Sequence, residues 1–296
     1  MSSAGTLIAE ADALTAPRFF GLLAPRRDNL ILAATKYHAA GLALKAERRW
    51  VEASNCFRLA ATYSRMCGDS NRLFHATEQM IRMLIANGQY AEAHSMIMEG
   101  FLSVGAGSDI LERTDVRLCA ALELAPLFEA THPALALTLW ERCTEMCALR
   151  NLSARKYTCL RARAILKARQ GAYGEAADLH EQCFREGRGT PSSGPSLTYH
   201  LRQHAGTAVL LHLLHSGDVA FARAKAAEFL ALDYSLPDDR CWILATRVLS
   251  AVETMDARAF TDAIRHYAVL ALEPWFKTVL LRIKALITGI GEAGEL

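Results

Sequence analysis

Residues 30–64 read LILAATKYHAAGLALKAERRWVEASNCFRLAATYS, two alanine-rich runs that meet at a charged corner, Glu47-Arg48-Arg49. Alanine at the point where two helices cross lets their backbones approach closely, and large side chains fill the gaps beside the crossing. The stretch therefore predicts a helical hairpin whose second helix begins at Trp50. The large residues expected to fill the gaps are Tyr37, Leu44, Trp50, Phe57 and Tyr63.

The same kind of helix start returns at intervals along the chain. The tetrapeptides that begin at Trp50, Tyr90 and Tyr173 share the pattern aromatic, any residue, glutamate, alanine, and a related alanine-rich start lies at Pro133. These four starts are separated by 40, 43 and 40 residues. Repeats of about this length, each built from a helical hairpin, are typical of solenoids of the tetratricopeptide kind.

The repeat predicts an all-α fold, a right-handed tetratricopeptide-like helical-hairpin solenoid followed by a C-terminal helical bundle. Four hairpins are expected between Asp28 and Gly189, and the Gly-, Pro- and Ser-rich segment 187–196 then breaks the pattern. We expect an N-terminal array at residues 1–189, and a bundle with a short flexible tail at residues 190–296. The last helix, which begins at Pro274, is expected to bury one apolar face. That face consists of Phe276, Val279, Leu280, Ile283 and Ile287.

Composition narrows the class of protein. The 296 residues carry 33 basic and 31 acidic side chains, a formal net charge of +2 that gives no reason to expect nucleic-acid binding. The eight cysteines include no CxxC pair, which favours buried thiols of a reducing cytosol over disulfides. The N-terminal residues lack the pattern of a signal peptide, and the longest apolar run, Ala208–Leu214, is too short to span a bilayer. A soluble cytoplasmic protein is expected.

Residues 17–27, PRFFGLLAPRR, place four large apolar side chains on a short connection between prolines. Connections normally run over the surface. One interpretation is a membrane-attachment loop, whose apolar side chains enter the acyl boundary while neighbouring arginines meet anionic headgroups. The other is a loop that tucks against the first hairpin as a cap. The apolar residues are Phe19, Phe20, Leu22 and Leu23.

A basic stripe is expected on the helix that follows residue 152. Lys156, Arg163 and Lys167 are separated by 7 and 4 residues, which places them within about 40° of one another on a helix. The preceding hairpin also carries a basic residue, Arg117, on its first helix, and first helices line the concave face of such solenoids. One hypothesis is a cationic concave surface for an acidic, elongated partner. The alternative is an ordinary solvated face.

The sequence offers no constellation typical of an active site, so no catalytic residue, metal site or cofactor is predicted. His200 and His204 lie at the i, i+4 spacing that can hold zinc on a helix. They lack the glutamate of an HExxH motif and any nearby acidic or thiolate third ligand. An enzyme with a site around these two histidines stays an alternative that a pocket uniting them with a carboxylate would favour.

Three stretches together resemble the soluble NSF attachment protein (SNAP) family, as a divergent member. They are the apolar loop at residues 19–23, the first hairpin from Tyr37 to Tyr63, and the last helix, WFKTVLLRIK at residues 275–284. The likeness spans the whole chain but is detailed at its two ends. It implies a non-enzymatic adaptor that binds SNARE complexes and recruits and stimulates the AAA+ ATPase NSF, for SNARE disassembly in vesicle fusion and intracellular protein transport. Several copies per SNARE complex and a peripheral position on the cytosolic face of endomembranes are also implied.

The resemblance extends to site residues, with two departures. A basic SNARE-contacting position of the family falls on Arg117, so the charge is kept, whereas a second falls on Thr158. Neighbouring basic residues of the same helix, Lys156, Arg161, Arg163 and Lys167, are the candidates to take its place. The family tail is rich in acidic residues with a penultimate leucine. Here the expected ATPase-engaging residues are Glu292, Glu295 and the final Leu296. A tetratricopeptide-type scaffold for an unrelated peptide or protein is the alternative function.

Overall fold

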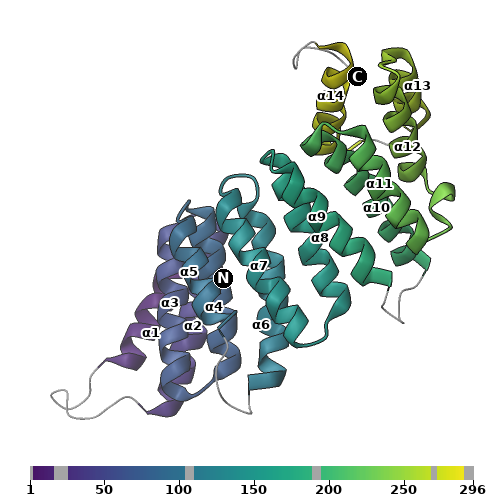
Figure 1. Ribbon diagram of the computed structural model, residues 1–296. Helices are drawn as coiled ribbons and strands as arrows, with labels where there is room; N and C mark the ends of the chain where they lie inside the picture. Colours follow the sequence, from purple (N-terminus) through teal and green to yellow (C-terminus); the bar gives the residue numbers. More distant parts are fainter. Residues whose placement is uncertain (1–2, 17–25, 104–109, 189–194, 268–271, 290–296) are drawn as a thin grey trace. The chain divides into compact units, whose positions relative to one another are not determined.

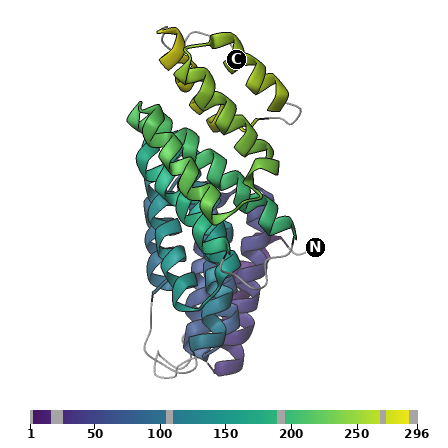
Figure 2. The same ribbon diagram turned by 45° about the vertical axis from the view of Figure 1, so that its right-hand side comes forward.

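Helices make up the regular secondary structure of this computed structural model (Figure 1, Figure 2). It describes residues 3–16, 26–103, 110–188, 195–267 and 272–289. These residues form fourteen α-helices and two short 3-10 helices, and no strand occurs among them. The prediction of an all-α fold is therefore confirmed.

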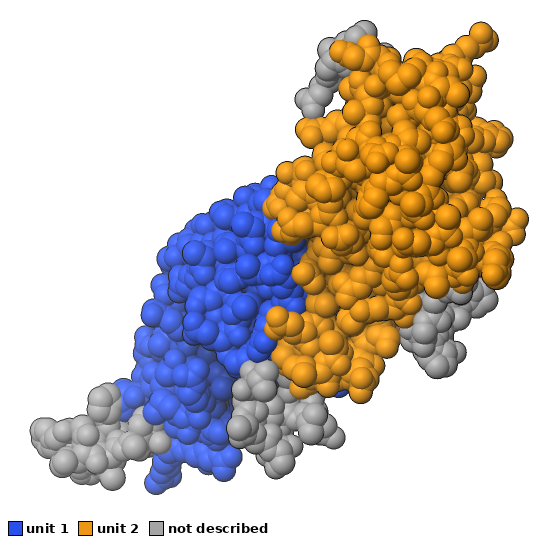
Figure 3. Space-filling model, viewed as in Figure 1, with its two compact units in different colours: residues 1–142 blue, residues 143–296 orange. Residues whose placement is uncertain are grey.

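Two compact units, residues 1–142 and 143–296, divide the chain (Figure 3). The division falls inside helix α7 (Pro133–Leu149). The boundary expected from the sequence lies between residues 189 and 190, in a segment outside the described residues. That division into array and bundle stays a prediction.

Unit 1 contains successive helical hairpins. Helix α2 pairs with α3, α3 packs on α4, and α4 packs on α5 (Figure 1). The turns between them are short and use residues with positive φ, such as Arg48 and Gly68. The bounds are α1 Ala4–Thr15, α2 Arg27–Ala46, α3 Trp50–Cys67, α4 Ser70–Ala86, α5 Tyr90–Gly100, α6 Ile110–Leu124 and the 3-10 helix η1 Ala125–Phe128, followed by the first part of α7.

The α2/α3 hairpin is packed as its sequence predicts. Tyr37, Leu44 and Phe57 are buried almost completely, and Ala40 and Ala53 lie fully buried beside them. Trp50 and Tyr63 are half-buried at the edges of the same clusters. Alanine at the crossing and large side chains around it therefore account for this hairpin.

Helix α1 packs along α2 and extends this core to the N-terminal residues. Its Ala11 is fully buried in a cluster with Tyr37. The Tyr37 hydroxyl donates a hydrogen bond to the Asp12 carboxylate, and Lys36 pairs with Glu10. The two acidic residues Glu10 and Asp12 thus attach α1 to α2.

Unit 2 begins with the end of α7 and contains the α8/α9 hairpin and a larger helical core. That core is formed by apolar side chains of α9, α10, α11, α12, α13 and α14, together with Ala168 of α8 and Leu236 of η2. The expected apolar face of α14, from Phe276 to Ile287, is buried there and is therefore confirmed. The bounds are α8 Ser153–Arg169, α9 Tyr173–Arg188, α10 Pro195–Ser216, α11 Val219–Leu232, η2 Leu236–Asp238, α12 Arg240–Glu253, α13 Ala257–Tyr267 and α14 Pro274–Thr288.

Helices α10 and α12 approach each other closely at Gly206. The first turn of α12 is held by Asp239, whose buried carboxylate accepts hydrogen bonds from the backbone N–H groups of Cys241 and Trp242, at 2.9 and 3.1 Å. A Cβ atom on Gly206 would lie 2.7 Å from the backbone carbonyl of Cys241. Glycine is therefore required at this position by the backbone of the neighbouring helix.

Gly206→Ala is expected to lower the free energy of unfolding by about 1–3 kcal/mol, because a capped helix end must move to admit the methyl group. Urea denaturation measures the change. Gly100→Ala is the matched control, since a Cβ there meets nothing within 4 Å. It should be neutral or stabilising by up to about 1 kcal/mol. Equal effects of the two substitutions would show that the α10–α12 contact imposes no such constraint.

Candidate partner-binding surface

Four of the five basic residues predicted to bind a partner lie on α8. Lys156, Arg163 and Lys167 share one face of the helix, as their spacing predicts. Arg161 lies about 140° around the helix from Lys156, so it belongs to a different face. The predicted stripe therefore consists of three residues.

Acidic side chains of unit 2 pair with Lys156, Arg161 and Lys167. Nζ of Lys156 lies 2.6 Å from Oε2 of Glu186 on α9. The Nζ of Lys167 lies 2.7 Å from Oε2 of Glu175, also on α9. Arg161 pairs with Glu273, the residue that precedes α14, at 3.2 Å. The spacing of basic residues along α8 does not reveal these acidic partners.

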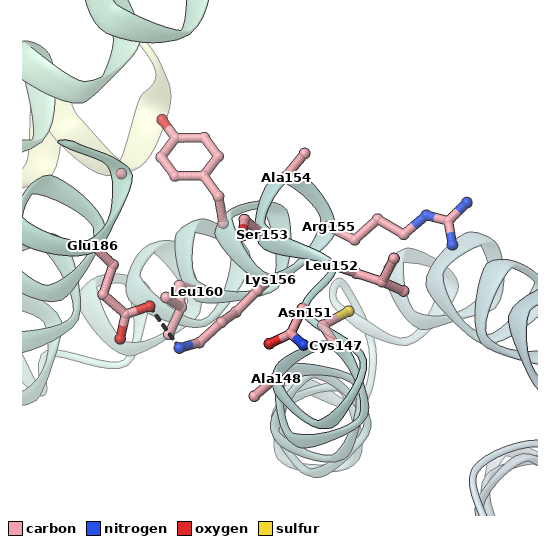
Figure 4. A pocket seen from close by; sticks show the side chains of 12 residues that line it. Cys147, Ala148, Asn151, Leu152, Ser153, Ala154, Arg155, Lys156, Leu160 and Glu186 are labelled. Carbon is pink, nitrogen blue, oxygen red and sulfur yellow. Dashed lines mark ion pairs between the residues drawn. The ribbon is translucent and has the colours of Figure 1, made fainter. Parts of the chain in front are cut away.

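The ion pair of Lys156 lies in a pocket of about 550 Å³ beside the start of α8 (Figure 4). Figure 4 shows the ammonium group of Lys156 facing the carboxylate of Glu186, with Asn151 and Leu160 close to them. Asn151 has a positive φ of 57°, which turns the chain from α7 into α8. The pocket is wide enough to admit a side chain of a partner next to Lys156.

Arg117 is the fifth predicted residue, and it lies half-buried on α6 of unit 1. The α8 residues belong to unit 2. The expectation that Arg117 and the α8 residues line one concave surface therefore stays a prediction. The expected membrane-attachment residues Phe19, Phe20, Leu22 and Leu23, and the expected ATPase-engaging residues Glu292, Glu295 and Leu296, lie outside the described residues.

A histidine pair, His180 on α9 and His204 on α10, is a feature that the sequence analysis did not find. Their Nδ1 atoms are 2.5 Å apart, and Nε2 of His204 lies 2.7 Å from the Tyr157 hydroxyl. Both rings are buried, and His180 stacks on Trp275 with ring centroids 6.0 Å apart. Burial, with a smaller effect of nearby Arg161, lowers the pKa of His180 to about 3. His180 is therefore placed as a neutral core group.

This pair also bears on the enzyme alternative. The two rings line a cavity of about 210 Å³ that includes Glu273. The Glu273 carboxylate accepts hydrogen bonds from Arg161 and from Nε1 of Trp275, at 3.2 and 2.6 Å. Its oxygens are thus occupied by a cation and an indole, and not by an imidazole. Of the two histidines that the sequence singles out, His204 lies in this cavity, where it contacts His180 of α9.

Neither a membrane span nor a metal cluster occurs in the part of the chain that the structure describes. None of its helices is both long and apolar enough to cross a bilayer. Likewise, His, Cys, Asp and Glu side chains nowhere gather there in a group of three or more that could hold a metal ion.

Stacked helical hairpins with paired charges along their faces define a helical-repeat protein of the kind that presents surfaces to partners. The sequence model of the family described as "Soluble NSF attachment protein, SNAP" matches residues 2–288. The chain belongs to this family, as its two ends and first hairpin predicted.

Curated relatives are similar over a shorter part of the chain. The Beta-soluble NSF attachment protein of Bos taurus is 30% identical over 143 residues, 48% of this chain and 45% of the relative. The Alpha-soluble NSF attachment proteins of Mus musculus and Homo sapiens are each 30% identical over 141 residues, 47% of this chain and 45% of the relative. Each of these matches therefore spans a little under half of the relative's length.

Proposed function

We propose that this chain is a non-enzymatic adaptor that binds SNARE complexes and recruits and stimulates an NSF-type AAA+ ATPase, which disassembles them in vesicle fusion and intracellular protein transport. The observation that carries the proposal is the match of the family model to residues 2–288. The names of the relatives supply the NSF attachment role at the level of the family. Several copies act on one SNARE complex, at the cytosolic face of endomembranes.

The basic residues of α8 support the SNARE-binding part of the proposal. Lys156, Arg163 and Lys167 form a stripe that an elongated acidic bundle can follow. Exposed ion pairs contribute roughly 0.2–1 kcal/mol each, so binding through such a stripe is weak for one copy and sensitive to salt. Several copies held on one membrane raise the effective concentration and compensate for this weakness.

ATP-dependent disassembly of a purified SNARE complex by NSF, with and without this protein, tests the proposal. The protein is expected to bind the complex and to accelerate its disassembly. Binding without acceleration would restrict the function to SNARE capture. Absence of both would favour the alternative of a scaffold for an unrelated peptide or protein.

The membrane-attachment loop has its own test. Phe19→Ser with Phe20→Ser is expected to lower activity on SNARE complexes anchored in liposomes at least several-fold, because serine cannot supply the burial of the two aromatic rings that attaches the loop to the membrane. Activity on soluble SNARE bundles should be kept. Equal losses on both substrates would show that the loop supports the fold instead.

A further inference from the structure

The α8/α9 hairpin carries two matched ion pairs, Lys156–Glu186 and Lys167–Glu175. The lysines are eleven residues apart on α8 and the glutamates are eleven residues apart on α9, about three helical turns in each case. Because the two helices are antiparallel in the hairpin, both pairs occur in the same register. Their Nζ–Oε2 distances are 2.6 and 2.7 Å. Carboxylates of α9, the second helix of the hairpin, thus neutralise the two lysines of the stripe on α8.

The two partners of each pair differ in exposure. The side chains of Lys156 and Lys167 are 24% and 21% exposed, whereas those of Glu186 and Glu175 are 40% and 64% exposed. The glutamate side chains are therefore more exposed than the lysine side chains with which they pair. An acidic ligand that approaches this hairpin meets an accessible carboxylate beside each lysine.

Glu186 has a second partner, so its pair with Lys156 can open at low cost. Nε2 of Gln182 donates a hydrogen bond to Oε1 of Glu186, at 2.7 Å. Burial acts to raise the pKa of the Glu186 carboxyl, but hydrogen bonds from Lys156 and Gln182 outweigh it and lower the pKa. The carboxylate is thus ionised at neutral pH. Its Gln182 contact can persist while an incoming carboxylate takes Lys156 in the pocket of about 550 Å³.

We infer that Glu175 and Glu186 are built-in competitors of an acidic partner, and that this partner must displace both of them from Lys156 and Lys167 in order to bind. The inference rests on the proposed function, in which α8 faces an acidic helical bundle. Eleven residues of helix span about 16 Å. A helix that carries carboxylates at this interval can open both pairs together, whereas an isolated acidic group opens one. The competition therefore selects long, regularly charged partners.

Removal of the two competing charges should tighten binding. Each exposed pair contributes roughly 0.2–1 kcal/mol, so the loss of two pairs corresponds to an affinity about 2- to 30-fold higher. The Kd of the full chain for a soluble four-helix SNARE bundle is measured at several salt concentrations for the wild type and for Glu175→Gln/Glu186→Gln. The double variant should bind about 2- to 30-fold more tightly, with a steeper dependence on salt because two more cations face the ligand. Glu175→Gln alone, at the more exposed site, should give a part of this gain.

Glu52→Gln/Glu253→Gln is the matched control. It changes the net charge by the same amount and breaks pairs with Arg49 and Arg223, and its two substitutions lie on α3 and α12, outside the α8/α9 hairpin. Its Kd should stay within about 2-fold of the wild type. If the wild type binds and the α9 double variant binds no more tightly, or if both double variants gain equally, the inference is wrong while the proposed function stands. If no form binds the bundle, the proposed function fails and the inference fails with it.

Discussion

Lys156→Glu with Lys167→Glu is expected to weaken binding to a SNARE bundle about 10- to 100-fold. Each reversal removes one attraction to the acidic partner and adds one repulsion, and together they change the binding free energy by about 1.4–2.8 kcal/mol. The new glutamates would also face Glu186 and Glu175, so the hairpin itself would become strongly acidic. Equilibrium binding to a soluble bundle measures the loss.

A charge-swapped variant separates binding from folding. Adding Glu186→Lys and Glu175→Lys to the two reversals restores both ion pairs in the opposite direction and restores the net charge. The hairpin should recover its stability, whereas the cations now sit on α9 at the more exposed positions. Tight binding of the charge-swapped variant is expected if the acidic partner recognises only the net charge of the hairpin. Weak binding is expected if the partner requires the cations to lie on α8. Unchanged binding of the simple double reversal would remove these lysines from the partner-binding surface.

Local sequence patterns were sufficient for the hairpins and for α14. The alanine crossing at Ala40 and Ala53 and the apolar face that begins at Phe276 depend on residues within one helix or one hairpin. Helical periodicity reports such faces directly. The same periodicity placed Lys156, Arg163 and Lys167 on one side of α8.

Contacts between helices that depend on packing angle and register were not predictable in the same way. The pairs of Lys156 and Lys167 with α9 require the register of an antiparallel hairpin, which the isolated α8 pattern does not contain. His180 meets His204 across two helices, and Gly206 meets the capped end of α12. Such contacts are set by how each helix rotates and slides against its neighbour, and a single sequence carries little signal for that.

Acidification from pH 7.5 to pH 5 is expected to lower the free energy of unfolding by about 2 kcal/mol through His180 alone. Burial lowers the pKa of His180 to about 3 in the folded chain, whereas an exposed histidine in the unfolded chain has a pKa near 6.5. At a pH between these two pKa values, the unfolded state binds a proton at His180 and the folded state does not. The free energy of unfolding therefore falls as the pH drops below about 6.5. At pH 5 this difference amounts to about 1.5 pH units at 1.36 kcal/mol each. Burial also lowers the pKa of His212, despite the nearby Glu181 carboxylate, and this adds to the loss.

Urea denaturation at pH 7.5, 6 and 5 measures this effect. His180→Asn removes the titrating ring but keeps an amide that can hydrogen-bond to His204. The variant should be less stable than the wild type at pH 7.5. Its free energy of unfolding should fall by about 2 kcal/mol less on acidification, because the titrating group is gone. His266→Gln is the control, because His266 is exposed on α13 and its replacement should leave the pH dependence of the wild type unchanged. The same pH dependence in His180→Asn and in the wild type would mean that the His180 imidazole takes up its proton inside the folded chain, contrary to its burial between His204 and Trp275.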